Sequence, residues 1–205
     1  FNPIHYGHLV TAEEALKQFK LDKVIFIPTG CPPHKTKGIL ASPEDRYLMT
    51  VIATASNQDF FVSRMEIDRH GKSYTIDTLR ELKKIFKEKA TLYFITGADA
   101  ILEILSWKNP TEVLDLCKFI AATRHGYDIR KIEELKNKLF FLKQNENSEN
   151  IKILEDFKEY IFIMEIPALA ISSTDIRLRI KQKKPIKYLL PESVCNYLLK
   201  HGLYK

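Results

Sequence analysis

The chain has 205 residues, of which 45% are hydrophobic and 28% are charged, and its net charge is +6. This is enough apolar material for one sizeable core, so we expect a folded protein with a single domain over residues 1–205. The net positive charge is compatible with binding to nucleic acid, to an anionic surface or to a polyphosphate ligand. No arginine-rich tail or RNA-binding aromatic signature accompanies it, so a small phosphorylated ligand fits at least as well as nucleic acid.

Three widely spaced cysteines, without a CxxC pair, are typical of reduced thiols inside the cell. No apolar run approaches the length of a membrane span, and no signal peptide is visible. We therefore expect a cytoplasmic protein without a membrane partner.

The first helix is expected to start at a pair of histidines. His5 and His8 lie on either side of Gly7, and apolar residues recur at helical spacing over residues 9–19. A helix N-terminus presents unpaired N–H groups and a partial positive charge, which suits a phosphate, and Gly7 allows a close approach. Alternatively, both histidines are ordinary surface or capping residues, because so short a motif often matches by chance.

A buried strand is expected at residues 23–28, followed by a loop at residues 29–38. Loops that follow strands carry ligand contacts in α/β proteins, so His34 and Lys35 are candidates for binding an anion. The alternative is that Lys35 is a solvated loop residue.

The next helix is expected to begin at Ser42, with Pro43 in its first turn. Its core face is expected to consist of Leu48, Val51, Ile52 and Ala55. Two short strands, at residues 60–62 and 65–67, precede a polar stretch and a helix at residues 76–87.

Two further strands each lead into polar residues. The strand at residues 91–95 runs into Gly97 and then Asp99 at a helix start, where an acid suits hydrogen bonding to a sugar hydroxyl; a plain capped helix is the alternative. Trp107 follows, as a core residue or as a platform for a ligand, and its polar surroundings favour a partly exposed ring. The strand at residues 119–123 leads to Arg124, and a helix is expected at residues 129–141.

The last strand, at residues 160–166, follows a polar loop or insertion at residues 143–150. Three hydroxyl residues, 172–174, then cap a helix with Arg177 one turn in. Hydroxyls, free N–H groups and a guanidinium at one helix end make a second candidate anion site, although capping alone also explains them. A last helix at residues 192–201 is expected to end at Gly202, which completes a helical segment over residues 173–205.

Strands alternate with helices along the whole chain, which predicts an α/β fold with a doubly wound parallel sheet. The candidate ligand groups each follow a strand, and they would collect at one edge of that sheet. Several cationic or helix-end anion sites at one edge indicate a polyphosphate nucleotide.

Taken together, the motifs resemble a known family. HxGH at residues 5–8 with ISSTDIR at residues 171–177 resembles the HxGH nucleotidyltransferase superfamily, and four further features resemble its bacterial nicotinate-nucleotide adenylyltransferases. These features are PPHK at residues 32–35, SYTIDT at residues 73–78, GAD at residues 97–99, and Trp107. The family places a strand and a Gly-Gly-Thr turn before the residue that corresponds to Phe1, so we expect about ten more residues upstream, a strand plus a tight turn in length.

The resemblance implies a Rossmann-like fold with ATP and nicotinate mononucleotide as partners, and Mg²⁺ bridging phosphate oxygens. His5, His8, Lys35 and Arg177 would be catalytic. Ser173 and Thr174 would join Arg177 at the β- and γ-phosphates. Gly97 and Asp99 would lie by the nucleotide sugar and base, with Arg124 on the adenine side. The nicotinate nucleotide would meet Ser73, Tyr74, Thr75, Trp107 and Lys108.

Other functions stay open at this point. Within the superfamily, the acceptor could be nicotinamide mononucleotide or phosphopantetheine, or the enzyme could be a cytidylyltransferase. Outside it, an RNA-binding module or a regulatory nucleotide sensor would also use a basic surface. The sequence leaves a homo-oligomer open.

Overall fold

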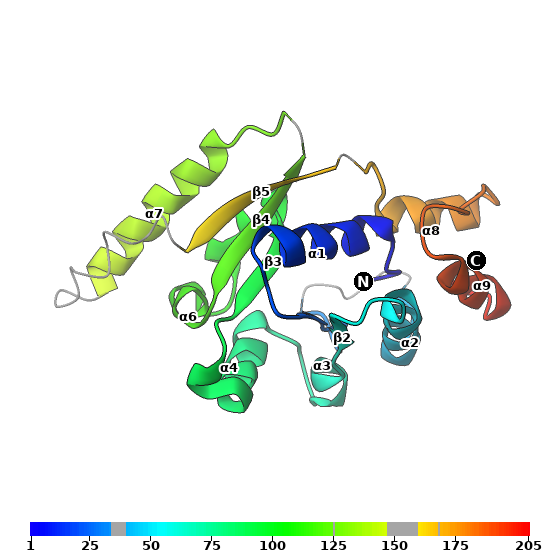
Figure 1. Ribbon diagram of the computed structural model, residues 1–205, viewed down its shortest axis with the longest axis horizontal. Coiled ribbons are helices and arrows are strands. Elements are labelled where there is room, and N and C mark those ends of the chain that lie inside the picture. The colour runs from blue at the N-terminus through cyan, green and yellow to red at the C-terminus, as the bar shows by residue number, and fades with distance from the viewer. Residues whose placement is uncertain (34–39, 125, 147–159, 168) are drawn as a thin grey trace. The chain divides into compact units, whose positions relative to one another are not determined.

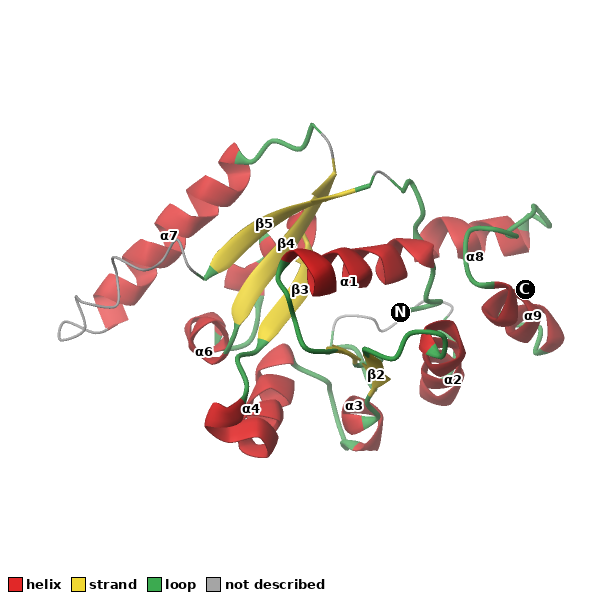
Figure 2. Ribbon diagram, in the orientation of Figure 1, coloured by secondary structure: helices red, strands yellow, loops and turns green. Residues whose placement is uncertain are grey.

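The computed structural model describes residues 1–33, 40–124, 126–146, 160–167 and 169–205, with the backbone alone for residues 140–146. Its contacts divide the chain into two compact units, one of Phe1–Ser73 with Leu169–Lys205 and one of Tyr74–Ala168. Figures 1 and 2 show the elements of both units. No helix in the described ranges is long and apolar enough to cross a membrane.

The first unit holds a two-stranded parallel sheet, and its helices come from both of its chain segments. The strands β1 (Val24–Phe26) and β2 (Phe60–Val62) pair with Ile25 opposite Phe61. The helices are α1 (Tyr6–Gln18), α2 (Pro43–Thr54), α3 (Met65–Asp68), α8 (Ser173–Lys181) and α9 (Glu192–Lys200). Gly202, with φ of 61°, follows α9, so the expected helix end is confirmed.

Helix α2 begins as predicted but buries a different face. Ser42 Oγ accepts a hydrogen bond from the N–H of Asp45, which confirms the cap. The predicted core face was wrong: Leu48 is 42% exposed, while the neighbouring Thr50 is fully buried. The Thr50 hydroxyl donates to the carbonyl of Arg46 at 2.7 Å, so its polar group is satisfied within the helix. A polar residue can therefore face the core at no hydrogen-bonding cost.

The strand predicted at residues 65–67 was also wrong, because this segment is the short helix α3. The N–H groups of Ile67 and Asp68 donate to the carbonyl of Arg64 at 2.7 and 2.9 Å. Arg64 also pairs with Asp68 one turn later, at 3.1 Å. These local bonds close a helical turn, and three apolar-polar alternations are too few to predict a strand against them.

The second unit holds a three-stranded parallel sheet in the order β3-β4-β5, with β4 between its neighbours. Its strands are β3 (Tyr93–Gly97), β4 (Lys118–Arg124) and β5 (Ile161–Ile166). Its helices are α4 (Thr75–Phe86), η1 (Lys87–Lys89), α5 (Ala98–Ile101), η2 (Ile104–Ser106), α6 (Pro110–Leu116) and α7 (Arg130–Glu146). The predicted α/β fold with parallel strands is confirmed, and the described strands form two sheets.

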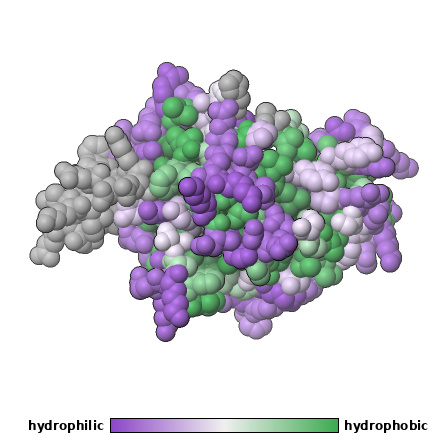
Figure 3. All heavy atoms as spheres, in the orientation of Figure 1, coloured by the Kyte–Doolittle hydropathy of each residue, from purple (hydrophilic) through white to green (hydrophobic). Residues whose placement is uncertain are grey.

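The buried core of the second unit combines both sheet and helix residues. Phe119 of β4 and Leu114 of α6 are fully buried, as are Ile76 of α4 and Ile132 of α7. Helices α4 and α6 pack against one another, as do α6 and α7. On the face that Figure 3 draws, hydrophilic and hydrophobic residues are interspersed over the described chain. Apolar side chains at the surface are normal, so the core rather than the surface identifies the fold.

Candidate active site

The two histidines lie at the start of α1, as the sequence predicts. His5 is the residue before the first helical one, and His8 is the third residue of the helix. The N–H of His5 donates to Nδ1 of His8 at 3.2 Å. The two rings lie with their centroids 3.8 Å apart and their planes 31° from parallel. The histidines therefore form one close pair, with tilted rings, at the helix N-terminus.

Gly7 is required by the packing of this pair. A Cβ atom at position 7 would lie 2.9 Å from both Cε1 and Nδ1 of His5. Carbon atoms do not approach a ring this closely, so any larger residue would displace the imidazole. The glycine of the HxGH motif thus serves the position of His5 as well as leaving room for a ligand.

Both histidines are neutral at physiological pH. His5 is 6% exposed, and burial lowers its pKa to about 4. Burial, followed by the effect of His5, lowers the pKa of His8 to about 2. Since His8 Nδ1 accepts the bond from His5, the proton of the neutral His8 ring is assigned to Nε2. His5 Nδ1 is buried and has no hydrogen-bond partner in the described chain.

The start of α8 is joined to the segment just before His5. Ser173 Oγ donates to the carbonyl of Pro3 at 2.8 Å, and Arg177 Nη1 donates to the carbonyl of Asn2 at 2.8 Å. Arg177 Nη2 also donates to Thr174 Oγ1 at 3.1 Å. These bonds join residues 170 and 175 positions apart in the chain. The two helix starts that the sequence singled out therefore meet in the first unit.

The loop that carries His34 and Lys35 lies outside the described residues. Its first residues are described, and Ser73 fixes them. The N–H of Ser73 donates to the carbonyl of Cys31 at 2.8 Å, and the N–H of Cys31 donates to Ser73 Oγ at 3.1 Å. Ser73 is buried, so this pair of bonds is shielded from water.

In the second unit, Gly97, Asp99 and Arg124 lie at the carboxyl ends of neighbouring strands. Gly97 ends β3 and Arg124 ends β4, and all three residues are exposed. Asp99 is the second residue of α5, whose cap is Gly97. A Cβ at Gly97 would meet no atom within 4 Å. Protein packing thus does not demand glycine here, which is consistent with the close approach of a ligand.

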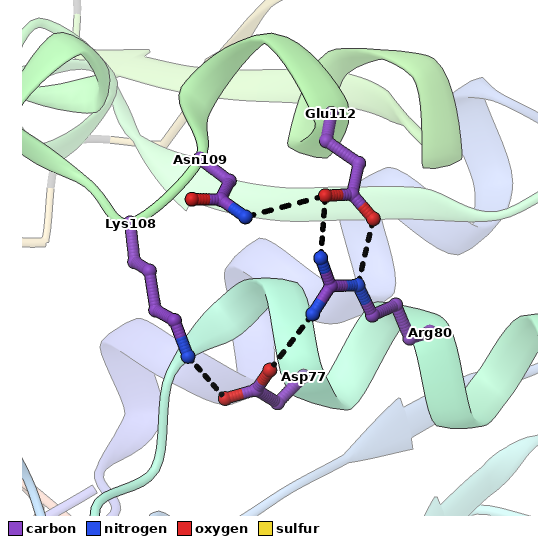
Figure 4. A network of polar contacts seen from close by, with 5 residues as sticks. All are labelled: Asp77, Arg80, Lys108, Asn109 and Glu112. Carbon is purple, nitrogen blue, oxygen red and sulfur yellow. Dashed lines mark hydrogen bonds and ion pairs between the residues drawn. The ribbon is translucent and has the colours of Figure 1, made fainter.

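The second unit also brings Lys108 to the start of α4. Its Nζ lies 4.5 Å from the centre of the Tyr74 ring and 3.2 Å from Asp77 Oδ2. Figure 4 shows the network that extends from the Lys108–Asp77 ion pair. In it, Asp77 contacts Arg80, and Arg80 makes two 2.6 Å hydrogen bonds to Glu112. Arg80 holds the pKa of the Glu112 carboxyl below its usual range.

Trp107 is half-buried and forms part of the core of this unit. Its ring lies edge-on to Phe94 with centroids 5.7 Å apart, and 6.3 Å from Phe119. Trp107 thus packs against the core and keeps a partly exposed side chain, and its use as a platform for a ligand stays a prediction.

Comparison with known proteins decides the family. A cytidylyltransferase-like family model matches residues 1–179. "Probable nicotinate-nucleotide adenylyltransferase" of Thermoanaerobacter sp. (strain X514) is 54% identical over 100% of this chain and 90% of its own length. The protein of the same name from Moorella thermoacetica is 52% identical over 100% of this chain and 88% of its own length. This chain belongs to the nicotinate-nucleotide adenylyltransferase family.

A solved structure agrees with the fold. The Plasmodium falciparum nicotinic acid mononucleotide adenylyltransferase complexed with APC matches with a TM-score of 0.71 and 21% identity, over 100% of this chain and 92% of that one. The expected nucleotidyltransferase fold of Rossmann-like type is thereby confirmed.

For a nicotinate-nucleotide adenylyltransferase, the chemical requirement is to hold two anionic substrates together. Two helix N-termini and the Arg177 guanidinium lie together in the first unit, and helix N–H groups and guanidinium groups are donors that suit phosphate. No group of three or more His, Cys, Asp or Glu side chains in the described ranges is placed to hold a metal ion.

Sequence reasoning missed two buried polar residues of the first unit. Asn2 and Arg46 lie among the groups that connect α8 to the loop after β1. A buried arginine inside a helix leaves no signal in hydrophobic periodicity, because the pattern treats every arginine as exposed.

Proposed function

We propose that this chain transfers the adenylyl group of ATP to nicotinate mononucleotide, in the step of NAD biosynthesis that forms nicotinate adenine dinucleotide and pyrophosphate. The observation that carries the proposal is the junction of the HxGH and ISSTDIR helix starts through Ser173 and Arg177. Membership of the family gives this junction its substrates.

In the proposed reaction, a phosphate oxygen of the mononucleotide attacks the α-phosphorus of ATP in line. A new P–O bond forms as the bond to the oxygen that bridges the α- and β-phosphorus breaks, and pyrophosphate leaves with that electron pair. The nucleophile is already an anion, so the reaction needs no general base. Catalysis then depends on positioning and on donors aimed at the developing charge.

His5 and His8 would contact the ATP phosphates. A neutral His8 donates through Nε2, and a neutral ring avoids the cost of burying a charge before the nucleotide binds. The negative phosphates would then raise the pKa of both rings, which strengthens these hydrogen bonds as the nucleotide enters.

The β- and γ-phosphates would lie at the start of α8. Ser173 through its backbone N–H, Thr174 and Arg177 would bind them there, with Lys35 approaching from its loop. Mg²⁺ would enter with ATP and neutralise part of the phosphate charge. The cationic groups of the chain would neutralise the rest, which lowers the repulsion between the two substrates.

The residues of the second unit would bind the nucleosides. Gly97 and Asp99 would meet the ATP sugar and base, with Arg124 on the adenine side. Trp107 would stack on the nicotinate ring.

The nicotinate carboxylate would lie at the start of α4. There it would meet the N–H groups near Thr75, with Ser73, Tyr74 and Lys108 around it.

A substrate-pair assay tests the proposal. We expect pyrophosphate release from MgATP with nicotinate mononucleotide, and a lower kcat/KM with nicotinamide mononucleotide. Phosphopantetheine, CTP in place of ATP, and RNA at moderate salt serve as controls for the rival functions. The proposal would be contradicted by turnover only with phosphopantetheine as acceptor, by turnover only with CTP in place of ATP, or by RNA binding without turnover.

A further inference from the structure

Asn2 is a junction between three segments of the first unit that are far apart in the chain. Its side chain is 7% exposed, and Oδ1 accepts hydrogen bonds from the Tyr204 hydroxyl at 2.6 Å and from the N–H of Ala41 at 3.1 Å. Its own carbonyl accepts the bond from Arg177 at 2.8 Å. The position of Asn2 therefore decides where the Arg177 guanidinium lies.

The Ala41 side of this junction is itself anchored. Arg46 is 3% exposed, and its Nε donates to the carbonyl of Ala41 at 3.2 Å. Its two terminal nitrogens donate to the carbonyls of Thr29 and Gly30. One buried guanidinium thus holds both described ends of the loop between β1 and α2, which makes Ala41 a fixed point against which Asn2 is set.

The Tyr204 side of the junction has an unusual backbone. Tyr204 is 4% exposed, and its φ is 65°, in the left-handed region that glycine and asparagine favour. A tyrosine in this conformation carries local backbone strain. Contacts of its side chain must offset that strain, and its described polar contact is the hydrogen bond to Asn2. Burial also raises the pKa of Tyr204, so its hydroxyl remains a donor.

We propose that Tyr204 is a positioning residue of the phosphate site, acting through Asn2 on the carbonyls that receive Arg177 and Ser173. The proposal rests on the assignment of Arg177 and of the start of α8 to the ATP phosphates. Tyr204 touches no substrate. It holds Asn2 and Pro3 in the position from which Arg177 and Ser173 are aimed, so its loss should weaken ATP binding and leave the mononucleotide site unchanged.

The test uses Tyr204→Phe in the full chain, which removes the hydroxyl and keeps the ring. The matched control is Tyr197→Phe, because Tyr197 also donates its hydroxyl at 2.8 Å, but to Asp45 at the start of α2 rather than to Asn2. Both variants lose one hydrogen bond of the first unit, so both should lose a similar amount of thermal stability. MgATP binding is measured by calorimetry without the second substrate, and KM is then measured for each substrate.

We expect Tyr204→Phe to weaken MgATP binding and raise the KM for ATP by about threefold to tenfold, the scale of one hydrogen bond. The KM for nicotinate mononucleotide should stay the same, and Tyr197→Phe should change neither constant. In an Asn2→Ala background, Tyr204→Phe should have no further effect on ATP binding.

Equal MgATP affinity in the wild type, Tyr204→Phe and Tyr197→Phe would overturn the inference. Equal weakening by both tyrosine variants would also overturn it, since the effect would then be one of general stability. Absence of MgATP binding by the wild type would instead refute the proposed function, so the two failures are distinguishable.

Discussion

The two histidines of the opening motif show how one residue sets the state of another. His5 occupies a buried position that exists because Gly7 has no side chain, and the neighbouring ring of His8 shares that environment. Burial keeps both rings neutral, and the bond from the His5 backbone directs the proton of His8 to Nε2. The neutral His8 ring thereby keeps one donor, Nε2–H, which the proposed mechanism assigns to a phosphate oxygen.

Replacement of His8 by alanine tests that donor. We expect His8→Ala to lower turnover by ~10²-fold or more, the scale for losing one donor to the transition state, because the pyrophosphate-forming step loses that stabilisation. Steady-state kinetics with MgATP and nicotinate mononucleotide measure the effect. The control is His70→Ala, since His70 is exposed and lies in a polar stretch. Near-normal turnover in His8→Ala would remove His8 from the mechanism.

The lowered pKa values of the pair also predict how stability depends on pH. The unfolded chain takes up a proton on each histidine near pH 6.5, whereas the folded chain takes them up only near pH 4 and pH 2. Stability should therefore be constant above about pH 7 and fall as the pH drops from 6.5 towards 4. Each histidine contributes a slope of about 1 kcal/mol per pH unit.

Urea unfolding at pH 7.5, 6.0 and 5.0, without nucleotide, measures this slope. A His5→Gln variant should reduce it by about half, because one of the two titrating groups is gone. A free energy of unfolding that is the same at pH 7.5 and 5.0 in the wild type would show that the pKa values of the two rings are not lowered in the folded chain.

Among the elements, the helices begin where capping residues predict and bury faces that only packing determines. Ser42 and Ser172 cap α2 and α8 through the N–H groups of Asp45 and Asp175. The buried face of α2 differs from its most hydrophobic stripe, because Arg46 is drawn inward by three backbone carbonyls. Capping is a local property, so the sequence predicts it, whereas which face of a helix is buried depends on residues distant in the chain.

The turn after β1 gives a prediction at this scale. A Cβ at Gly30 would lie 1.9 Å from the carbonyl oxygen of Glu66, so Gly30→Ala must push two backbone segments apart. We expect it to lower the free energy of unfolding by about 2 kcal/mol or more. Gly97→Ala is the matched control, since its Cβ would meet nothing within 4 Å.

Chemical denaturation of Gly30→Ala and Gly97→Ala measures this difference in the free energy of unfolding. Equal stability of Gly30→Ala and Gly97→Ala would mean that the turn does not pack against Glu66. Gly97→Ala should keep its stability even if nucleotide binding suffers, which separates the two roles of glycine in this chain.

In the whole molecule, the first unit is built from both ends of the chain and the second from its middle. His5 and Arg177 thus belong to one unit although the second unit lies between them in sequence. The first unit can complete its core only when its two chain segments, which lie on either side of the second unit in sequence, come together. The expectation of a single domain over residues 1–205 therefore has a physical basis and stays a prediction.

Unfolding followed by two probes tests cooperativity. Trp107 is the only tryptophan and lies in the second unit, so its fluorescence reports on that unit alone. Far-ultraviolet circular dichroism reports on the helices of both. We expect the two urea transitions to coincide, as for one cooperative domain. Transitions separated beyond their error would show that the units unfold independently.

Local signals sufficed for the α/β pattern, the helix caps, and the HxGH and ISSTDIR motifs, because strand runs, caps and short motifs are encoded by neighbouring residues. Tertiary structure alone decided that Ser173 and Arg177 meet the carbonyls of Pro3 and Asn2, and that Arg46 lies buried. It also decided that burial holds the His5 and His8 rings neutral. These features depend on contacts across as many as 202 positions, as between Tyr204 and Asn2, and no local periodicity encodes such contacts.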